Sequence, residues 1–182
     1  MKPILMIHEF KEDFLNLPLE DYILTFDDGL FTQYKFFEQI KKIKTKKYFF
    51  ISSGIICPED VNQNNEYILC AEAHRKAFLG DCTNYMKWSQ IKEINNSKDC
   101  IIGCHSHFHM RKTAGCVECI ILDNLKMFNE FNKHLKYMPD SFCFPYNYET
   151  PLYKEILYKK GFTNFFGNER INIEEIINGQ IN

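Results

Sequence analysis

Residues 22–29 read Tyr-Ile-Leu-Thr-Phe-Asp-Asp-Gly, an apolar run that ends abruptly in two adjacent carboxylates and a glycine. Two carboxylates side by side repel each other. A cation at the mouth of a buried strand would remove that cost and shift their pKa values apart. Asp27 and Asp28 would then divide the work, one binding a metal ion while the other handles protons. The alternative is a strand that ends in an Asp-Gly turn, and this stretch alone favours that simpler interpretation.

A second stretch of the sequence favours the metal-site interpretation over the simple turn. Residues 101–109 read Ile-Ile-Gly-Cys-His-Ser-His-Phe-His, again a short apolar strand followed by groups suited to bind metal. His105 and His109 are four residues apart, so one helical turn or a tight loop can direct both imidazoles at one ion. Two histidines and one aspartate leave room for water, which is the pattern of catalytic rather than structural zinc sites. The two stretches together predict a catalytic divalent-metal site.

The composition suits a globular enzyme. The chain has 182 residues, of which 45% are hydrophobic, and we expect residues 1–182 to form a single domain with a substantial core. The net charge is -2, and acidic and basic residues are interspersed. This distribution of charge offers no basic surface for a nucleic acid partner. The sequence also contains no membrane span.

The cysteines invite a disulfide framework, since there are 8 of them. However, the chain is not small, and residues 1–7 are too short and too quickly followed by charge to act as an export signal. We therefore expect a cytoplasmic protein whose thiols are reduced. Cys116 and Cys119 form a lone C-x-x-C, interpreted as incidental, with a redox or zinc role as the alternative.

Strand-like and helix-like patterns alternate along the chain, without hairpin signals. Apolar runs and helical spacing predict strands at 3–7, 22–26, 47–51, 101–104, 142–144 and 162–166, and helices at 31–44, 71–79, 88–94, 117–135 and 153–160. A loop is expected at 111–115 and a closing element at 171–177. The helix at 117–135 is expected to turn Ile121 and Leu125 towards the core. This alternation implies parallel strands joined by crossover helices.

Polar or turn residues follow most of these strands. They are Asp27, Ser52, His105, Pro145 and Asn168. In a parallel barrel, residues just after the strands share one rim, so we expect these five to lie around one pocket.

The other histidines receive simpler interpretations. His8 ends the first strand, where packing is the commoner role, but it is kept as a site candidate because that strand end can face the pocket of Asp27. His74, on a predicted helix, is expected to be solvated. His134 is interpreted as structural, because a cation near the end of a helix suits the helix dipole.

Together these residues resemble the polysaccharide deacetylase (NodB-homology) family. Residues 25–29, Thr-Phe-Asp-Asp-Gly, match its first motif in full, and residues 105–109 fit its second motif, His-[Ser/Thr]-x-x-His. Residues 142–147, Phe-Cys-Phe-Pro-Tyr-Asn, resemble the third motif, and residues 4–8 resemble the opening strand of many members. The resemblance covers nearly the whole chain and implies an α/β fold, a distorted, incomplete (β/α) barrel.

The resemblance also implies roles for individual residues. It assigns Asp27 as the general base and places the backbone N–H of Tyr146 at the oxyanion, directly after Pro145, so that Pro145 and Tyr146 contact the substrate. It implies three metal ligands, which are Asp28, His105 and His109. The metal is divalent, usually zinc, with cobalt or nickel as alternatives.

Three features depart from the family pattern. Cys143 stands nearest the position of the third-motif arginine that orients the base, no Asp-Trp fourth motif is found, and the closing Leu-x-His that supplies the general acid is absent. Arg170, at a predicted strand end, is a candidate to orient Asp27 instead. His8 is the most natural replacement acid. His107 is a weaker candidate, since the middle histidine of such a motif more often packs or supports the ligands.

These features predict a metal-dependent hydrolase that removes an N-acetyl or other acyl group from an amino sugar or glycan precursor inside the cell. One alternative is a related hydrolase of another C–N bond, such as a deformylase or a ureide or imide hydrolase. The other is a carbohydrate-binding protein that keeps the metal but has lost turnover, which the missing acid histidine makes credible.

Overall fold

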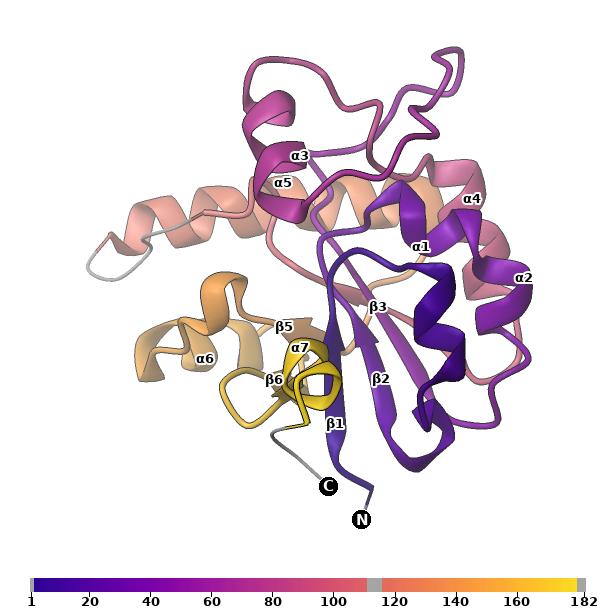
Figure 1. The fold of residues 1–182 in the computed structure, drawn as a ribbon. Coiled ribbons are helices and arrows are strands. Elements are labelled where there is room, and N and C mark those ends of the chain that lie inside the picture. The colour runs from indigo at the N-terminus through magenta and orange to yellow at the C-terminus, as the bar shows by residue number, and fades with distance from the viewer. Residues whose placement is uncertain (1, 111–115, 180–182) are drawn as a thin grey trace.

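The apolar runs form one parallel sheet in the computed structural model, which describes residues 2–110 and 116–179 (Figure 1). Its strands are β1 (Ile4–Ile7), β2 (Ile23–Phe26), β3 (Lys47–Ile51), β4 (Cys100–Cys104), β5 (Ser141–Cys143), β6 (Asn164–Phe166) and β7 (Ile171–Asn172). Their order is β6-β5-β4-β3-β2-β1-β7, with every pair parallel. The alternating sequence pattern therefore predicted the parallel pairing correctly, and the closing element expected at 171–177 begins with the edge strand β7. The expected loop at 111–115 lies outside the described residues.

The sheet curls into an open, incomplete barrel. The ring of Phe166 on β6 lies 4.9 Å from the rings of both Tyr48 and Phe50 on β3, although β4 and β5 separate the two strands. Neighbouring strands are about 4.8 Å apart, so in a flat sheet β3 and β6 would be about 14 Å apart. The rings meet only because the sheet is curved, and together with Cys143 they fill its inner face.

Gly103 lets this inner face close. A Cβ atom at this position of β4 would lie 2.4 Å from the ring of Phe50, which is fully buried. Such a distance is a steric overlap, and a ring enclosed by the barrel has no free space to move into. A glycine inside an otherwise apolar strand is thus explained by the large aromatic side chain on the adjacent strand.

Helices pack on the outer face of the sheet and above the carboxyl ends of its strands (Figure 1). They are α1 (Phe31–Lys35), α2 (Phe37–Ile40), α3 (Cys70–Phe78), α4 (Trp88–Asn95), α5 (Val117–Leu135), α6 (Pro151–Tyr158) and α7 (Ile173–Ile177), with short 3-10 turns η1 (Glu12–Asn16), η2 (Leu19–Asp21) and η3 (Pro145–Asn147). The main apolar core lies between these elements and the sheet. Among the described residues, no helix is both long enough and apolar enough to cross a membrane.

Two expectations about the helices were wrong. The single helix expected at 31–44 is two short helices, because Phe36 leaves helical geometry (φ -102°, ψ 14°). The break lets Phe36 pack against Phe10. On α5, Ile121 and Leu125 are largely exposed, and the buried face instead includes the polar residues Asp123 and Asn124. The apolar pattern could not show this, since both polar side chains are buried by forming hydrogen bonds.

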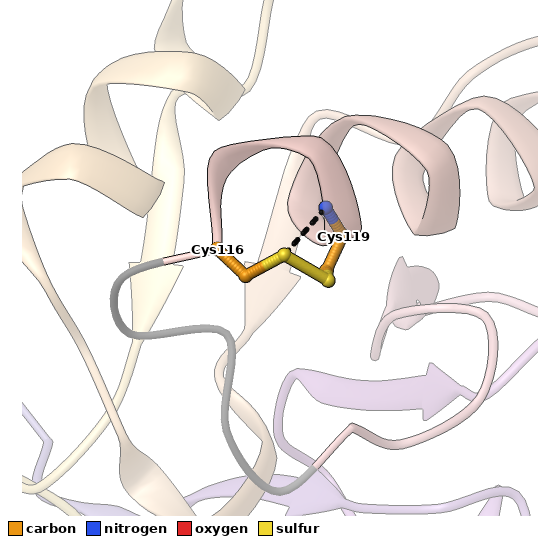
Figure 2. Close-up of a disulfide and its surroundings, with 2 residues drawn as sticks. All are labelled: Cys116 and Cys119. Carbon is orange, nitrogen blue, oxygen red and sulfur yellow. Dashed lines mark hydrogen bonds between the residues drawn. A yellow bond between two sulfur atoms is a disulfide. The ribbon is translucent and has the colours of Figure 1, made fainter.

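The interpretation of the C-x-x-C as an incidental pair of reduced thiols was also wrong. Cys116 and Cys119 form a disulfide at the start of α5 (Figure 2). The first helical turn brings their Cα atoms to 5.3 Å, within the range that a disulfide spans. The Cys116 sulfur also caps the helix by accepting a hydrogen bond from the Cys119 N–H. The other six cysteines are free.

Candidate active site and metal centre

The ends of β2 and β4 bring together Asp28, His105 and His109, which are all buried. The Asp28 Oδ1 atom lies 3.2 Å from His105 Nε2 and 3.0 Å from His109 Nε2. Ligands bound to zinc at about 2.0–2.2 Å in a tetrahedron are separated by about 3.3–3.5 Å, so these spacings suit one ion. The structure thus gathers the three expected ligands at one point.

The tautomer of His105 shows why a cation is needed there. Its Nδ1 lies 2.8 Å from the Cys143 carbonyl oxygen. A carbonyl oxygen only accepts, so Nδ1 carries a proton and Nε2 faces the Asp28 carboxylate. Burial lowers the pKa of this ring, but Cys143 and Asp28 raise it well above its ordinary value, and a bound cation would take the place of the Nε2 proton. Two electron-rich atoms 3.2 Å apart in a buried site repel unless positive charge lies between them. Metal-binding histidines are commonly oriented through such a bond to a backbone carbonyl.

The charge at Asp28 agrees with this arrangement. Burial alone would raise its pKa, but the imidazoles of His109 and His105 hold the pKa well below the ordinary value. Asp28 is therefore an anion at neutral pH. The donor set of one carboxylate and two imidazoles fits zinc, cobalt or nickel.

Asp27 is directed to a different partner. Arg170 NH1 lies 2.8 Å from both of its carboxylate oxygens, and both side chains are almost completely buried. Burial would raise the pKa of Asp27, but Arg170 and, to a smaller extent, His105 lower it below the ordinary value. The neighbouring carboxylates thus have separate counter-charges. This separation leaves Asp27 ionised and able to accept a proton.

Arg170 is itself held at three further points. Its guanidinium donates to the Gly167 carbonyl at 3.1 Å, to the Thr25 hydroxyl at 3.0 Å and to the Asn147 side-chain oxygen at 2.7 Å. These bonds connect the β6–β7 loop to β2 and to η3. Arg170 therefore occupies a fixed position beside Asp27, as the arginine expected to orient that residue would. No sequence signal pointed to Asn147.

A second group of donors lies close to this pair. Asp27, His105 and Cys143 present ligand-type atoms within 4.8 Å of one another. However, Arg170 already neutralises Asp27. Burial and the Asp27 charge raise the pKa of Cys143 to about 11, so its sulfur is a thiol at neutral pH. We place the ion at Asp28, because its carboxylate faces the imidazoles of His105 and His109 and has no arginine partner among the described residues.

The backbone around the site is unusual. In the described part of the chain, seven non-glycine residues have positive φ, and five of them lie here: Asp28, Ser106, His109, Tyr146 and Asn147. Each such conformation costs free energy and persists only where surrounding contacts enforce it. The concentration at the ends of β2, β4 and β5 indicates that this rim is shaped for function.

Asp123 on α5 enforces the conformation of the histidine loop. Its carboxylate accepts hydrogen bonds from the backbone N–H groups of His107, at 2.8 Å, and Phe108, at 3.0 Å. The His107 ring adds a bond to the Ser53 hydroxyl at 2.9 Å, which gives this middle histidine a supporting contact. Sequence reasoning missed Asp123, because an acid within a long amphipathic helix carries no local signal.

We expect Asp123→Asn to weaken zinc binding by about 10–100-fold, the usual effect of losing a group that supports metal ligands. An asparagine accepts one of the two N–H bonds with its oxygen but directs its own NH₂ group at the other. The measurement is a zinc titration against a competing chelator. Glu118→Gln, an exposed change in the first turn of the same helix, serves as the control. Equal affinity in all three proteins would refute this role.

The site contains a cavity of about 660 Å³, and Asp27 and His105 line it, whereas Ser52, Pro145 and Asn168 are not among its lining residues. His8 and Tyr146 line it beside the metal candidates. The His8 Nε2 is 3.9 Å from Asp28 Oδ2, and its side chain is one-third exposed (33%). Pro145 is buried and begins η3, the turn that carries Tyr146. The roles of these residues remain predictions.

The expectation that His74 is solvated was wrong. Its side chain is buried in the cavity wall, and burial lowers its pKa although Asp28 acts in the opposite direction. Its Nε2 lies 3.6 Å from Asp28 Oδ1. The spacing of Cys70 and His74 on one helical face was the only signal available, and many surface helices carry such pairs.

Comparisons with known proteins agree with this site and fold. The sequence model of the family described as polysaccharide deacetylase matches residues 17–165. A comparison with curated protein sequences finds no match. A solved structure of IcaB from Ammonifex degensii is similar, with 20% identity, a TM-score of 0.67 and coverage of 95% of this chain and 92% of that one.

Two further solved structures are similar. One is a de-N-acetylase from Aggregatibacter actinomycetemcomitans, with 14% identity, a TM-score of 0.65 and coverage of 93% of this chain and 92% of that one. The other is the deacetylase domain of BpsB from Bordetella bronchiseptica, with 13% identity, a TM-score of 0.65 and coverage of 91% of this chain and 88% of that one. These likenesses show that the fold is shared: a distorted, incomplete (β/α) barrel.

Proposed function

Because this chain belongs to the polysaccharide deacetylase family, we propose that it is a metal-dependent carbohydrate N-deacetylase acting on an acetylated amino sugar or glycan precursor. The observation that carries the proposal is that the two adjacent carboxylates face different partners. Asp28 faces the imidazoles of His105 and His109, whereas Asp27 faces Arg170. A metal-dependent hydrolase needs a metal site and a separate base. Asp28 and the two histidines can form the metal site, and Asp27 can act as the base.

Asp27 is the proposed general base. It is ionised, held by Arg170 and among the residues that line the cavity. When bound, a divalent ion at Asp28 would polarise the acyl oxygen and lower the pKa of water from about 16 towards about 7. Asp27 then takes the proton as the water oxygen attacks the acetyl carbon. General-base catalysis of this kind contributes about 10²–10⁴-fold to the rate.

Two other groups are assigned by their place in the cavity. The Tyr146 backbone N–H is proposed to donate to the developing oxyanion, a contribution of about 3 kcal/mol in comparable sites. His8 is proposed to protonate the departing amine, since it lines the cavity and remains partly accessible to solvent. It compensates for the closing histidine motif that this sequence lacks. The products are acetate and the free amino sugar.

Acetate release tests the proposal. The purified protein is stripped with a chelator and then reloaded with zinc, cobalt or nickel. N-acetylglucosamine oligomers, nucleotide-linked N-acetyl sugars and lipid-linked N-acetyl sugars are offered in turn. We expect no acetate from the stripped protein and restored release after loading.

The same panel separates the alternatives. Formamides and cyclic ureides are included, and turnover of these alone would indicate a hydrolase of another C–N bond. If the loaded protein binds N-acetyl sugars but hydrolyses none of the substrates, the deacetylase proposal is rejected in favour of a binding protein.

A further inference from the structure

Helix α3 brings two additional side chains to the metal candidate. It belongs to the excursion between β3 and β4 and lies over the carboxyl ends of the strands in Figure 1. Cys70 Sγ lies 3.0 Å from Asp28 Oδ2, and His74 Nε2 lies 3.6 Å from Asp28 Oδ1. Because positions four apart share a helical face, α3 presents both groups to the same carboxylate.

The orientation of His74 repeats that of His105. Its Nδ1 lies 3.2 Å from the carbonyl oxygen of Cys70, so Nδ1 donates and the Nε2 lone pair of the neutral ring points into the site. That Nε2 atom is buried and has no hydrogen-bond partner among the described residues. At 3.6 Å it is too far from Asp28 for a hydrogen bond. A buried acceptor atom left unpaired in this way is costly unless a ligand satisfies it.

Three Nε2 atoms therefore surround one carboxylate oxygen, from His74, His105 and His109, at 3.6, 3.2 and 3.0 Å. The His74 and His109 ring centres are only 4.3 Å apart, and the ligand atoms of these two residues and Asp28 lie within 4.8 Å of one another. A single divalent ion supplies the positive charge and lets all three rings remain neutral. These distances of 3.0–3.6 Å resemble the separations of ligands around one zinc ion, and a centre that expands to five ligands still accepts the water or the acyl oxygen.

We infer that His74 is a fourth protein ligand, through Nε2, of the ion held by Asp28, His105 and His109. This inference rests on the metal centre of the proposed function. Three imidazoles and one carboxylate form a set that favours zinc, cobalt or nickel over magnesium or calcium. It also makes α3 part of the metal centre, although the helix lies outside both stretches that supply the other ligands, residues 25–29 and 105–109.

Cys70 supports this arrangement without being a ligand. Its thiol lies 3.0 Å from Asp28 Oδ2 and donates a hydrogen bond to that oxygen. A bond to Oδ2 leaves Oδ1, the atom nearest the three imidazoles, for the ion. Ligating carboxylates are commonly hydrogen-bonded in this way.

The test compares wild type with His74→Gln and with His134→Gln. His134 is a matched control, because it packs on Trp88 and does not line the cavity. Zinc affinity is measured by competition with a chromophoric chelator, and the number of bound imidazoles by X-ray absorption at the zinc edge. We expect three imidazoles in wild type and in His134→Gln. In His74→Gln we expect two imidazoles and an affinity at least about 10–100-fold lower.

Other results would overturn the inference in distinguishable ways. Two imidazoles in wild type, with equal affinity in His74→Gln, would remove His74 from the ligand set while leaving the proposed metal centre intact. Failure of folded wild type to bind zinc, cobalt or nickel would reject the metal centre, and the inference with it. Circular dichroism of each apo protein verifies folding before metal is added.

Discussion

Asp27→Asn is expected to lower kcat for acetate release by about 10²–10⁴-fold, while the protein still binds zinc at full stoichiometry. The amide preserves the shape of the side chain and can still accept a hydrogen bond from Arg170, but it cannot take a proton from water. Steady-state kinetics with the best N-acetyl substrate gives kcat, and the zinc titration gives the stoichiometry.

Asp28→Asn is the matched control, since it changes the adjacent carboxylate in the same way. We expect it to lose zinc affinity and activity together, because its side chain faces the imidazoles. If Asp27→Asn instead loses zinc, Asp27 is a ligand. If Asp27→Asn keeps normal kcat, another group is the base.

Arg170→Met is expected to lower the free energy of unfolding by about 3–5 kcal/mol, the usual cost of leaving one member of a buried ion pair without its partner. The Asp27 and Arg170 side chains are only 2% and 1% exposed, so bulk solvent screens the unpaired charge little. Urea denaturation measures the change. Part of the loss should return in the double variant Asp27→Asn/Arg170→Met, which has no unpaired charge.

Arg75→Met provides the surface comparison. Arg75 also pairs with a carboxylate, that of Glu72, but on the exposed side of α3. Solvent screens that pair, so its loss should change stability little. An equally small effect of Arg170→Met would show that the buried pair contributes no more than a surface pair.

Arg170→Met should also move the pH profile. Arg170 lowers the pKa of Asp27 against the effect of burial, so removing it raises that pKa. The base acts when ionised, which requires a pH above its pKa. The acid limb of kcat/KM should therefore shift to higher pH in any Arg170→Met protein that remains folded. An unchanged limb would mean that Asp27 is not the group titrating there.

The sequence alone determined the strands and the residues that follow them. Short apolar runs separated by helical patterns specify a parallel sheet, and a parallel sheet places the residues after its strands along one edge. Asp28 and His105 could therefore be expected to meet, although they are far apart in the chain. Local composition carried this information, because each ligand directly follows its own strand.

Only the tertiary structure decided which side chains complete the site. His74 and Asp123 lie on helices whose local patterns resemble those of ordinary surface or core helices, yet one faces Asp28 and the other holds the histidine loop. Their positions depend on how α3 and α5 pack over the rim of the sheet. The contact between Arg170 and Asp27 likewise depends on the curl of the barrel, which brings the loop after β6 beside β2. Such contacts come from long-range packing, which the spacing of residues along the chain does not encode.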